Sequence, residues 1–580
     1  MPAVAAGLCA LIGALDVADA LTPGYVDRVR WLAGYLPGTL SHAAVAATMV
    51  TGVLLLLLSH GLRRRKRRAW VAVVGLLALS VGLHMVKGLD VEEALIALAM
   101  LAALLRYRKE FCAVGDPQTR WLALVAFLGW GTLGVAVGLF VLSLGSRFLV
   151  SPHPLGAQFR QVLYGLVGVP GPLRFTTDRM ATTVAQLLFA MGMVTALTTA
   201  YLLLRPAEPA ATLLPTEEAS IRSLLARHGR RDSLGYFALR RDKSLIWSPS
   251  GKAAIAYRVV SGVMLASGDP LGDPEAWPGA IDRFLDECDR HAWTPAIMGC
   301  GQQGGEIWKR HGLDALELGD EAVVDVAAFT LDGRVMRNVR QMVARVERNG
   351  YTARARRVRD IPAAELAPLA EGSAAWRGGD TERGFSMALG RFADSEDGEC
   401  VAVTAHDHNG STRAFLHFVP WGRDGLSLDL MRRDRGADPG LNEFLIISAL
   451  RAAPDLGVRR LSLNFAVFRS ALERGEKLGA GFVLRRWHAV LIYGSRWFQI
   501  ESLYRFNAKF HPVWEPRFVC YRSAADLPRI ALAALEAEAF LVWPGSPTEL
   551  LRRIPRPGRS APSSAAASDP VTDQVRTGHS

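Results

Sequence analysis

The sequence has few of the residues from which metal sites and disulfide frameworks are built. Its 580 residues include six cysteines, which are scattered without a CxxC pair or a histidine at metal-ligand spacing. A Gly-x-Ser-x-Gly nucleophile elbow is also missing, so Ser/His/Asp catalysis has no support. We therefore assign no disulfide framework, no metal ligand and no cofactor.

Acidic residues are scarce in two stretches of a chain whose net charge is +12. Between Arg334 and Arg359 there are nine arginines and one acid, Glu347. Residues 485–517 interleave six Lys or Arg residues with eight aromatics and only two acids. Basic and aromatic surfaces of this kind suit two anionic partners, phospholipid headgroups and RNA.

The first of these stretches has helical periodicity. Met336, Val339, Val343 and Val346 fall on one face of a helix. The opposite face carries Arg337, Gln341, Arg345 and Arg348. A solvated basic face is one interpretation, and the other is a surface opposite phosphate, to which arginine binds bidentately.

Long apolar runs are confined to the first 205 residues and predict a multi-pass membrane domain of about six helices, since about 20 residues cross the hydrocarbon core. The runs RRRKRR (63–68), RYRK (106–109) and Arg205 place the N-terminus and everything after residue 205 in the cytoplasm under the positive-inside rule, with loops 21–41 and 146–180 outside. The first run lacks the basic n-region of a signal peptide, so we expect it to be a membrane-spanning helix rather than a cleaved signal peptide. The six runs are 3–20, 42–60, 69–88, 91–106, 121–145 and 181–204.

After a Pro- and Ala-rich linker at 206–218, the pattern becomes mixed α/β and repeats. Two units are predicted, 219–365 and 366–545, followed by a disordered tail at 546–580. Each unit is a strand meander followed by a helix and a strand. The strands expected in the first are 236–240, 244–248, 253–260, 263–267, 294–298 and 322–329, with helices near 275–291 and 304–311. In the second they are 400–405, 412–419, 425–431 and 460–465, with a helix near 440–453.

This order is that of a tandem GNAT-type acyltransferase, yet the coenzyme A loop of such enzymes is missing. That loop places backbone N–H groups and a helix N-terminus on pyrophosphate. GCGQQGGE (299–306) is glycine-rich with the wrong spacing, and RRDRGADPG (432–440) lacks the last position. The acyl donor is therefore not expected to be a coenzyme A thioester.

Candidate catalytic residues lie in the second unit. Asp429 and Arg432 end a predicted strand and Glu443 opens the next helix, so these carboxylates could hold an ammonium group or accept a proton. A structural ion pair for the first two, and helix-dipole complementarity for Glu443, remain open. Lys509 and Arg517 alternate with aromatics that we expect in the core, and packing alone does not explain the two cations.

Four segments together resemble the aminoacyl-phosphatidylglycerol synthases, the multiple peptide resistance factor family, over most of residues 216–545. They are GDEAVVDVAAFTLDG (319–333), MRNVRQMVARVERNGY (336–351), LDLMRRD…PGLNEFLI (428–446) and YRFNAKFHPVWEPRFVCY (504–521). The resemblance implies a membrane-bound aminoacyltransferase that moves lysine or alanine from aminoacyl-tRNA to the glycerol hydroxyl of phosphatidylglycerol. The product lowers the negative charge of the membrane and gives resistance to cationic antimicrobial peptides.

The resemblance also implies site residues. The implied catalytic set is Asp429, Arg432, Glu443, Lys509 and Arg517. The implied tRNA or lipid contacts are Arg337, Arg345, Arg348, Arg496 and Arg505.

The membrane region is smaller than that of full-length family members, so no product flipping is assigned, and no lysyl-tRNA synthetase domain is expected to follow. A Fem-like ligase acting on a cell-wall precursor and a non-catalytic membrane sensor or transport component are the alternatives. The oligomeric state stays open, with a homodimer as one option.

Overall fold

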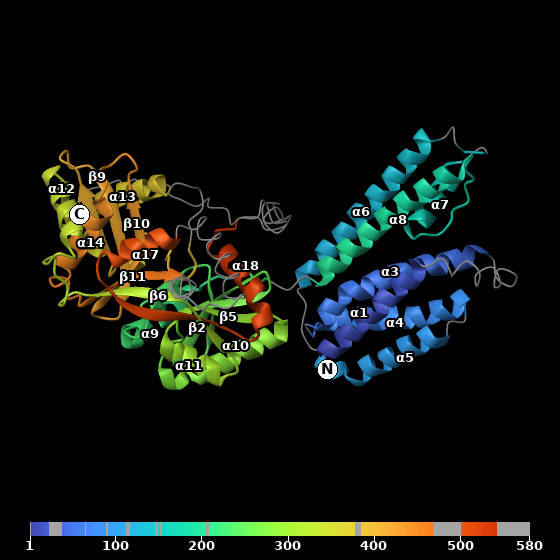
Figure 1. Cartoon of the computed structure of the whole chain (residues 1–580), viewed down its shortest axis with the longest axis horizontal. Coiled ribbons are helices and arrows are strands. Elements are labelled where there is room, and N and C mark those ends of the chain that lie inside the picture. The colour runs from blue at the N-terminus through green and yellow to red at the C-terminus, as the bar shows by residue number, and fades with distance from the viewer. Residues whose placement is uncertain are drawn as a thin grey trace, which may run out of the picture.

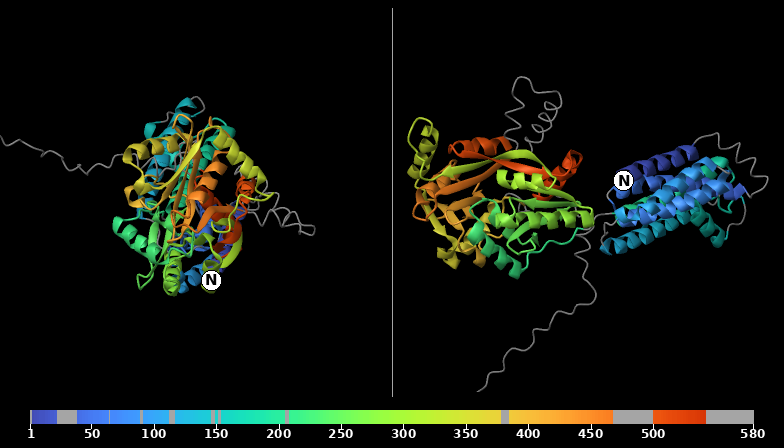
Figure 2. Two further views of the ribbon diagram at one scale, coloured as in Figure 1. Left: turned by 90° about the vertical axis from the view of Figure 1, so that its left-hand side faces the viewer. Right: turned by 90° about the horizontal axis from the view of Figure 1, so that it is seen from below.

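The computed structural model has a helical region followed by an α/β region, which appear as two separate bodies in Figure 1 and in the right-hand view of Figure 2. All structural statements below concern the residues that the structure describes. These are 2–21, 38–63, 65–88, 91–111, 117–145, 149–150, 154–204, 208–377, 384–467 and 500–541.

All six apolar runs form helices. By length and composition, two of the described helices could cross a membrane, over residues 121–144 and 178–203. The segment 146–180, expected to be a loop, contains a further helix, α7. The helices are α1 (Pro2–Leu21), α3 (Gly38–Arg63), α4 (Arg67–Gly88), α5 (Val91–Arg106), α6 (Pro117–Leu144), α7 (Leu155–Leu166) and α8 (Asp178–Leu204), with the 3-10 turn η1 (Arg108–Glu110).

Glycine allows the helices of this region to approach closely. A Cβ on Gly13 of α1 would lie 2.6 Å from the carbonyl oxygen of Gly52 in α3, so neither position has room for a side chain. Small residues at such crossings let apolar helices pack backbone to backbone. One apolar cluster joins α1, α3, α4 and α5, and another joins α6, α7 and α8.

The first unit of the α/β region begins inside the expected linker, because Pro215 opens a helix and the side chain of Glu217 accepts a hydrogen bond from the Leu214 N–H at 3.2 Å. Its elements are α9 (Pro215–His228), η3 (Gly235–Leu239), β1 (Ser244–Trp247), β2 (Ala253–Val260), β3 (Val263–Ser267), β4 (Leu271–Gly272), η4 (Pro274–Ala276), α10 (Trp277–His291), β5 (Thr294–Cys300), α11 (Gln302–Arg310) and β6 (Asp314–Asp325).

The second unit follows the same order. Its elements, with those that connect the two units, are α12 (Arg337–Arg348), β7 (Thr352–Arg357), η5 (Val358–Asp360), α13 (Ala363–Trp376), η6 (Ser395–Asp397), β8 (Val401–His406), β9 (Thr412–Trp421), β10 (Gly425–Arg433), α14 (Leu441–Ala452), β11 (Arg460–Val467), α17 (Ile500–Ala508), β12 (Val513–Tyr521), η7 (Ala524–Asp526) and α18 (Leu527–Ala537).

Two strand predictions were wrong. The run at 236–240 is the 3-10 turn η3, all of whose residues are buried, so its apolar character reflects a core turn and not a strand. The strand expected at 322–329 runs from Asp314 to Asp325. It stops there because the Asp325 carboxylate accepts hydrogen bonds from the N–H groups of Ala327 and Ala328, at 2.9 and 3.2 Å, and turns the chain.

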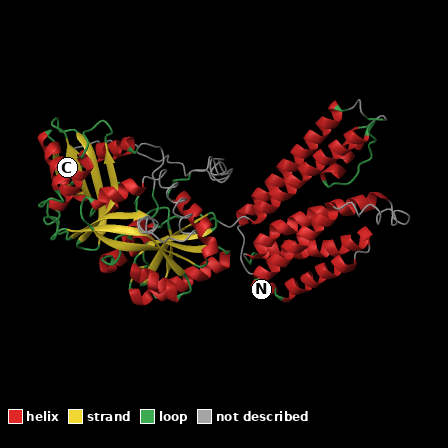
Figure 3. Cartoon of the chain, viewed as in Figure 1, coloured by secondary structure: helices red, strands yellow, loops and turns green. Residues whose placement is uncertain are grey.

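The twelve strands form one sheet in which the two units exchange their last strands. The order is β1-β2-β3-β5-β12-β6-β11-β10-β9-β8-β7, with β4 paired to β2. The last strand of the second unit, β12, therefore lies beside β5 of the first, and β6 of the first lies beside β11 of the second. Figure 3 shows these strands running through the middle of the α/β region. Each unit therefore contributes a strand to the part of the sheet formed by the other, and strand pairing links residues on both sides of the predicted boundary at 365/366. The position of that boundary stays a prediction.

Helices cover both faces of the sheet. Val339, Val343 and Val346 of α12 are buried with α14 against β8 to β11, which confirms the apolar face predicted for this helix. The helices α10 and α11 pack in the same way on the first unit, with Trp277 and Trp308 in the core. A further apolar cluster contains residues of both units, such as Leu265 of the first and Phe465 of the second, so the two units share part of their core.

Candidate active site

The strands β10 and β11 separate soon after they begin to pair. Their parallel register runs only from Gly425–Arg460 to Ser427–Ser462. Both strands then have irregularities in their pairing with their outer neighbours, between 428 and 430 in β10 and between 462 and 465 in β11. Asn464 has a positive φ of 66° at this point, and its side-chain amide donates to the carbonyl oxygen of Leu428. No pairing between these two parallel strands follows Ser427 and Ser462 in the described residues, and we call the region where the pairing ends the opening.

Three of the buried polar atoms without partners lie on elements next to the opening. Among the described residues, Ser427 Oγ, Asn464 Oδ1 and Asn442 Oδ1 have no hydrogen-bond partner, and they lie on β10, β11 and the first turn of α14. A buried polar atom left unsatisfied costs about 1–3 kcal/mol. A polar ligand in the opening would remove that cost.

Lys509 and Glu443, which sequence reasoning chose separately, form an ion pair next to this opening. Lys509 Nζ lies 2.7 Å from Glu443 Oε1. The lysine follows the last turn of α17, and the glutamate is in the first turn of α14. The Lys509 side chain is 40% exposed and that of Glu443 only 9%, so the pair combines a buried anion with a cation that solvent or a ligand can reach.

Asp429 is fully enclosed and bonded through both oxygens. Its Oδ2 lies 2.6 Å from His417 Nδ1, and its Oδ1 accepts the Leu389 N–H at 2.6 Å. The irregularity of β10 between 428 and 430 brings it beside His417 of β9. Asp429 thus pairs with His417 and not with Arg432, which is half-buried further along β10 and has interactions of its own.

Sequence reasoning missed His417. The available signal was a histidine between Leu416 and Phe418, in a strand that is otherwise apolar after Arg413. A histidine there needs a partner when it is buried. The sequence alone does not say which strand supplies that partner.

Arg517 lies in the interior, where protein groups occupy its guanidinium. Its Nε lies 2.9 Å from Glu321 Oε2, and one terminal nitrogen contacts Asp232 Oδ1 at 2.7 Å and the Gly299 carbonyl oxygen at 3.2 Å. The other terminal nitrogen donates to Ser233 Oγ at 2.7 Å and to Glu321. A guanidinium has five N–H donors, and these five contacts use them all. No donor remains for a phosphate or an oxyanion.

A chain of hydrogen bonds nevertheless links Arg517 to the opening. Glu321, on β6, accepts from the hydroxyl of Ser462, and that hydroxyl oxygen accepts the Asn464 N–H at 3.1 Å. Burial alone would raise the pKa of Glu321, but Arg517 and the hydroxyls of Ser233 and Ser462 hold it below its ordinary value. Arg517 therefore keeps a buried carboxylate charged at the base of the opening.

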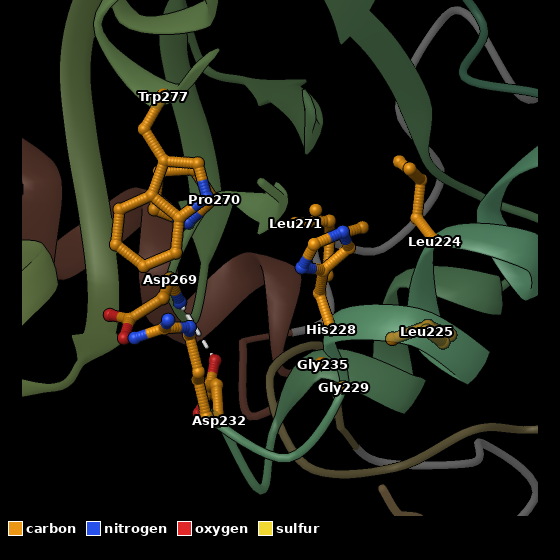
Figure 4. Close-up of a pocket in the computed structure, with 12 residues that line it drawn as sticks. Leu224, Leu225, His228, Gly229, Asp232, Gly235, Asp269, Pro270, Leu271 and Trp277 are labelled. Carbon is orange, nitrogen blue, oxygen red and sulfur yellow. Dashed lines mark hydrogen bonds between the residues drawn. The ribbon is translucent and has the colours of Figure 1, made fainter. Parts of the chain in front are cut away.

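The same cluster lines a small pocket next to α9. Asp269 accepts the Gly301 N–H at 2.8 Å, and its own N–H donates to Asp232 Oδ2 at 2.8 Å. Figure 4 shows Asp232 and Asp269 at one side of the pocket, with Trp277 above them. Burial, and then the charge of Asp232, raise the pKa of Asp269 to about 7. Within one cluster of charged groups, the pKa of Asp269 is thus raised while that of Glu321 is lowered.

The predicted tRNA or lipid contacts lie apart from this interior cluster. Arg337, Arg345 and Arg348 are exposed on α12, and Arg505 is exposed on α17. The Nε of Arg348 donates to the Ala344 carbonyl oxygen of its own helix at 3.2 Å. Arg496, with most of the basic aromatic stretch, lies outside the described residues.

Comparisons with known proteins agree on the α/β region. The sequence model of the family described as "Phosphatidylglycerol lysyltransferase, C-terminal" matches residues 222–521. The lysylphosphatidylglycerol biosynthesis bifunctional protein LysX of Mycolicibacterium vanbaalenii is 39% identical over 573 residues, which are 94% of this chain and 50% of that protein. LysX of Mycobacterium avium is 43% identical over 512 residues, 85% of this chain and 42% of that protein. The chain thus spans about half the length of the curated relatives it matches.

A solved structure matches the α/β fold. L-PGS from Bacillus licheniformis aligns with a TM-score of 0.51 at 23% sequence identity, covering 58% of this chain and 99% of that one. At this identity the likeness concerns the fold alone.

Proposed function

The chain belongs to the phosphatidylglycerol lysyltransferase C-terminal family, and from this premise we propose that it transfers lysine from lysyl-tRNA to a glycerol hydroxyl of phosphatidylglycerol. The names of the relatives favour lysine over alanine. The observation that carries the proposal is the Lys509–Glu443 ion pair beside the opening of β10 and β11. The product would lower the negative charge of the membrane and with it the affinity for cationic antimicrobial peptides.

The reaction exchanges one ester for another. The glycerol oxygen attacks the aminoacyl carbonyl carbon, the bond to the ribose oxygen of the tRNA breaks, and the glycerol proton ends on that ribose oxygen. Since the two esters are chemically alike, alignment of the two substrates and stabilisation of the oxyanion supply most of the acceleration. No coenzyme is needed, because the acyl group arrives already activated on the tRNA.

The geometry suggests different roles for the five predicted catalytic residues. Lys509, the most accessible, stabilises the oxyanion or a substrate phosphate, and Glu443 holds it and faces the amino group of the donor. Asp429 is a positioning residue that fixes the ring of His417. Arg517 is also a positioning residue, since it acts through Glu321 and Ser462, and Arg432 is assigned to a substrate phosphate.

We further propose that the helical region lies in the cell membrane as a multi-pass domain, with the N-terminus and the α/β region on the cytoplasmic side. Most of the exposed large hydrophobic side chains among the described residues belong to this region, including Trp121 at 71% and Val125 at 62% exposure on α6. Exposed apolar surface of that extent favours a lipid environment. The basic runs at 63–68 and 106–109 set the orientation.

Radiolabelled lysyl-tRNA supplied to membranes that contain the protein and phosphatidylglycerol tests the proposal. We expect labelled lipid that is lost on mild alkaline treatment, as an ester is, and no label when the tRNA is digested first. Alanyl-tRNA serves as the control donor. No labelled lipid with either donor would overturn the proposal, and an alkali-resistant product would point to an amide-forming, Fem-like ligase.

The exposed arginines of α12 are proposed to bind tRNA phosphate. Arg337→Glu combined with Arg345→Glu should raise KM for lysyl-tRNA at least about tenfold with little change in kcat, because a hydrogen bond to a charged group contributes about 1.5–3 kcal/mol. The salt dependence of KM should also become shallower. Arg310→Glu, an exposed arginine on α11, is the matched control. An unchanged KM in the double variant would exclude this surface as the tRNA site.

A further inference from the structure

The segment between α6 and α8 was expected to be an outward loop, but the structure folds part of it back along both helices. Val162 and Gly165 of α7 are buried against α6 and α8. The other side of α7 is also apolar: Leu155, Phe159 and Leu163 are 78%, 44% and 40% exposed. With Val167, 59% exposed just after the helix, they form a stripe of every fourth residue. A helix lying in water would place polar side chains along that stripe.

Close contacts fix how far α7 reaches. A Cβ on Gly192 of α8 would lie 1.8 Å from the Leu166 carbonyl oxygen, and a Cβ on Gly134 of α6 would lie 3.2 Å from the Leu166 side chain. At 1.5 Å per residue, Gly134 is about 15 Å from the end of α6 and Gly192 about 21 Å from the start of α8. The hydrocarbon core is about 30 Å thick. If α6 and α8 span it, the end of α7 lies near its middle.

In the segment that follows α7, VGVPGPLRF at 167–175, most backbone N–H groups are absent or hydrogen-bonded within the protein, as the hydrocarbon core requires. Pro170 and Pro172 have no N–H to satisfy. The N–H groups of residues 167–169 bond to carbonyl oxygens of the last turn of α7, and the Leu173 N–H donates to the buried side-chain oxygen of Gln161 at 3.0 Å. Unsatisfied N–H groups are costly in hydrocarbon, where only protein can supply partners.

The charged side chain in α7 also fits this arrangement. The Nε of Arg160 donates to the Gly156 carbonyl oxygen at 3.3 Å, one turn nearer the outer end of the helix. A long cationic side chain near an interface turns its charged end toward water in this way. Arg160 and Gln158 thus lie in the outer half of α7, and the inner half after Gln161 has no charged residue.

We propose that α7 and residues 167–175 form a re-entrant hairpin that enters the bilayer from the side opposite the α/β region and exposes the stripe of α7 to lipid acyl chains. The proposal rests on the membrane embedding of α6 and α8 proposed above. It adds a lipid-facing surface within a segment that the hydropathy pattern assigns to water.

Two valines of equal exposure provide the test. Val150, beyond the end of α6, and Val167 are each 59% exposed in the protein, so shielding by the protein itself does not account for a large difference in reactivity between Val150→Cys and Val167→Cys. Leu133→Cys, in the middle of α6 and 46% exposed, reports whether α6 spans. The described native cysteines are buried, and wild-type protein sets the background.

Each full-length variant is treated, in membranes open to both faces, with a maleimide too polar to enter the bilayer. We expect Val150→Cys to be labelled and Val167→Cys and Leu133→Cys to react at least tenfold more slowly, with all three labelled after denaturation in detergent. Leu163→Cys repeats the test within α7. Rapid labelling of Val167→Cys and Leu163→Cys with Leu133→Cys protected would overturn the hairpin alone. Labelling of Leu133→Cys would overturn the membrane embedding, and the hairpin with it.

Discussion

Replacing Arg517 with methionine is expected to cost about 3–5 kcal/mol in free energy of unfolding, because it leaves buried carboxylates without their counter-charge. Glu321 is 0% exposed and Asp232 7%, and both contact the guanidinium. In a thermal unfolding scan followed by tryptophan fluorescence, we expect the transition of the α/β region to fall by about 10 °C. Arg517→Lys should recover only part of the loss, since an ammonium has three donors where the site uses five.

Arg522 provides the matched control. It lies just after the same strand, and its ion pair with Asp289 at 2.5 Å is on the surface, with side chains 40% and 54% exposed. A surface pair contributes about 0–1 kcal/mol, so Arg522→Met should melt near wild type. If Arg517→Met kept the wild-type melting temperature and lost only activity, Arg517 would instead be a direct substrate contact.

The sequence alone predicted the helices and strands whose hydrophobic pattern and turn residues lie within one short stretch of the chain. The strands β2 and β3 coincide with their predicted ranges, because each alternates or runs apolar between Ser-Gly turns. The apolar face of α12 was equally readable, because helical periodicity needs no knowledge of the neighbouring elements.

What the sequence could not show depends on pairing between distant segments. The pairing of β6 with β12 joins residues that are about 200 positions apart in the sequence. Neither strand has a sequence pattern that identifies its neighbour in the sheet. Arg517 illustrates the consequence for the site. Its position in a basic, aromatic stretch indicated a polyanion surface, but its partners come from the start of the first unit and from β6, and together they make it an interior residue.

Lys509, in contrast to the interior Arg517, has an accessible side chain. Lys509→Ala is expected to lower kcat about 10²–10³-fold, which is the effect of removing one group that stabilises an oxyanion. The Lys509 side chain is 40% exposed and forms an ion pair with the carboxylate of Glu443, so the melting temperature should change far less than in Arg517→Met. KM for tRNA should stay close to wild type if tRNA is held mainly by α12. Lys309→Ala, at the corresponding end of α11 in the first unit, removes an exposed lysine as the control.

The Lys509→Ala variant alone has two explanations, since it also leaves the buried carboxylate of Glu443 without a partner. Glu443→Gln and the double variant separate them. If the unpaired carboxylate is what impairs the enzyme, adding Glu443→Gln to Lys509→Ala should restore most of kcat, because both charges are then gone. If the ammonium itself acts on the reacting ester, kcat in the double variant should stay as low as in Lys509→Ala. Recovery in the double variant would therefore reduce Lys509 to a structural partner of Glu443, and the oxyanion would need another donor near the opening between β10 and β11.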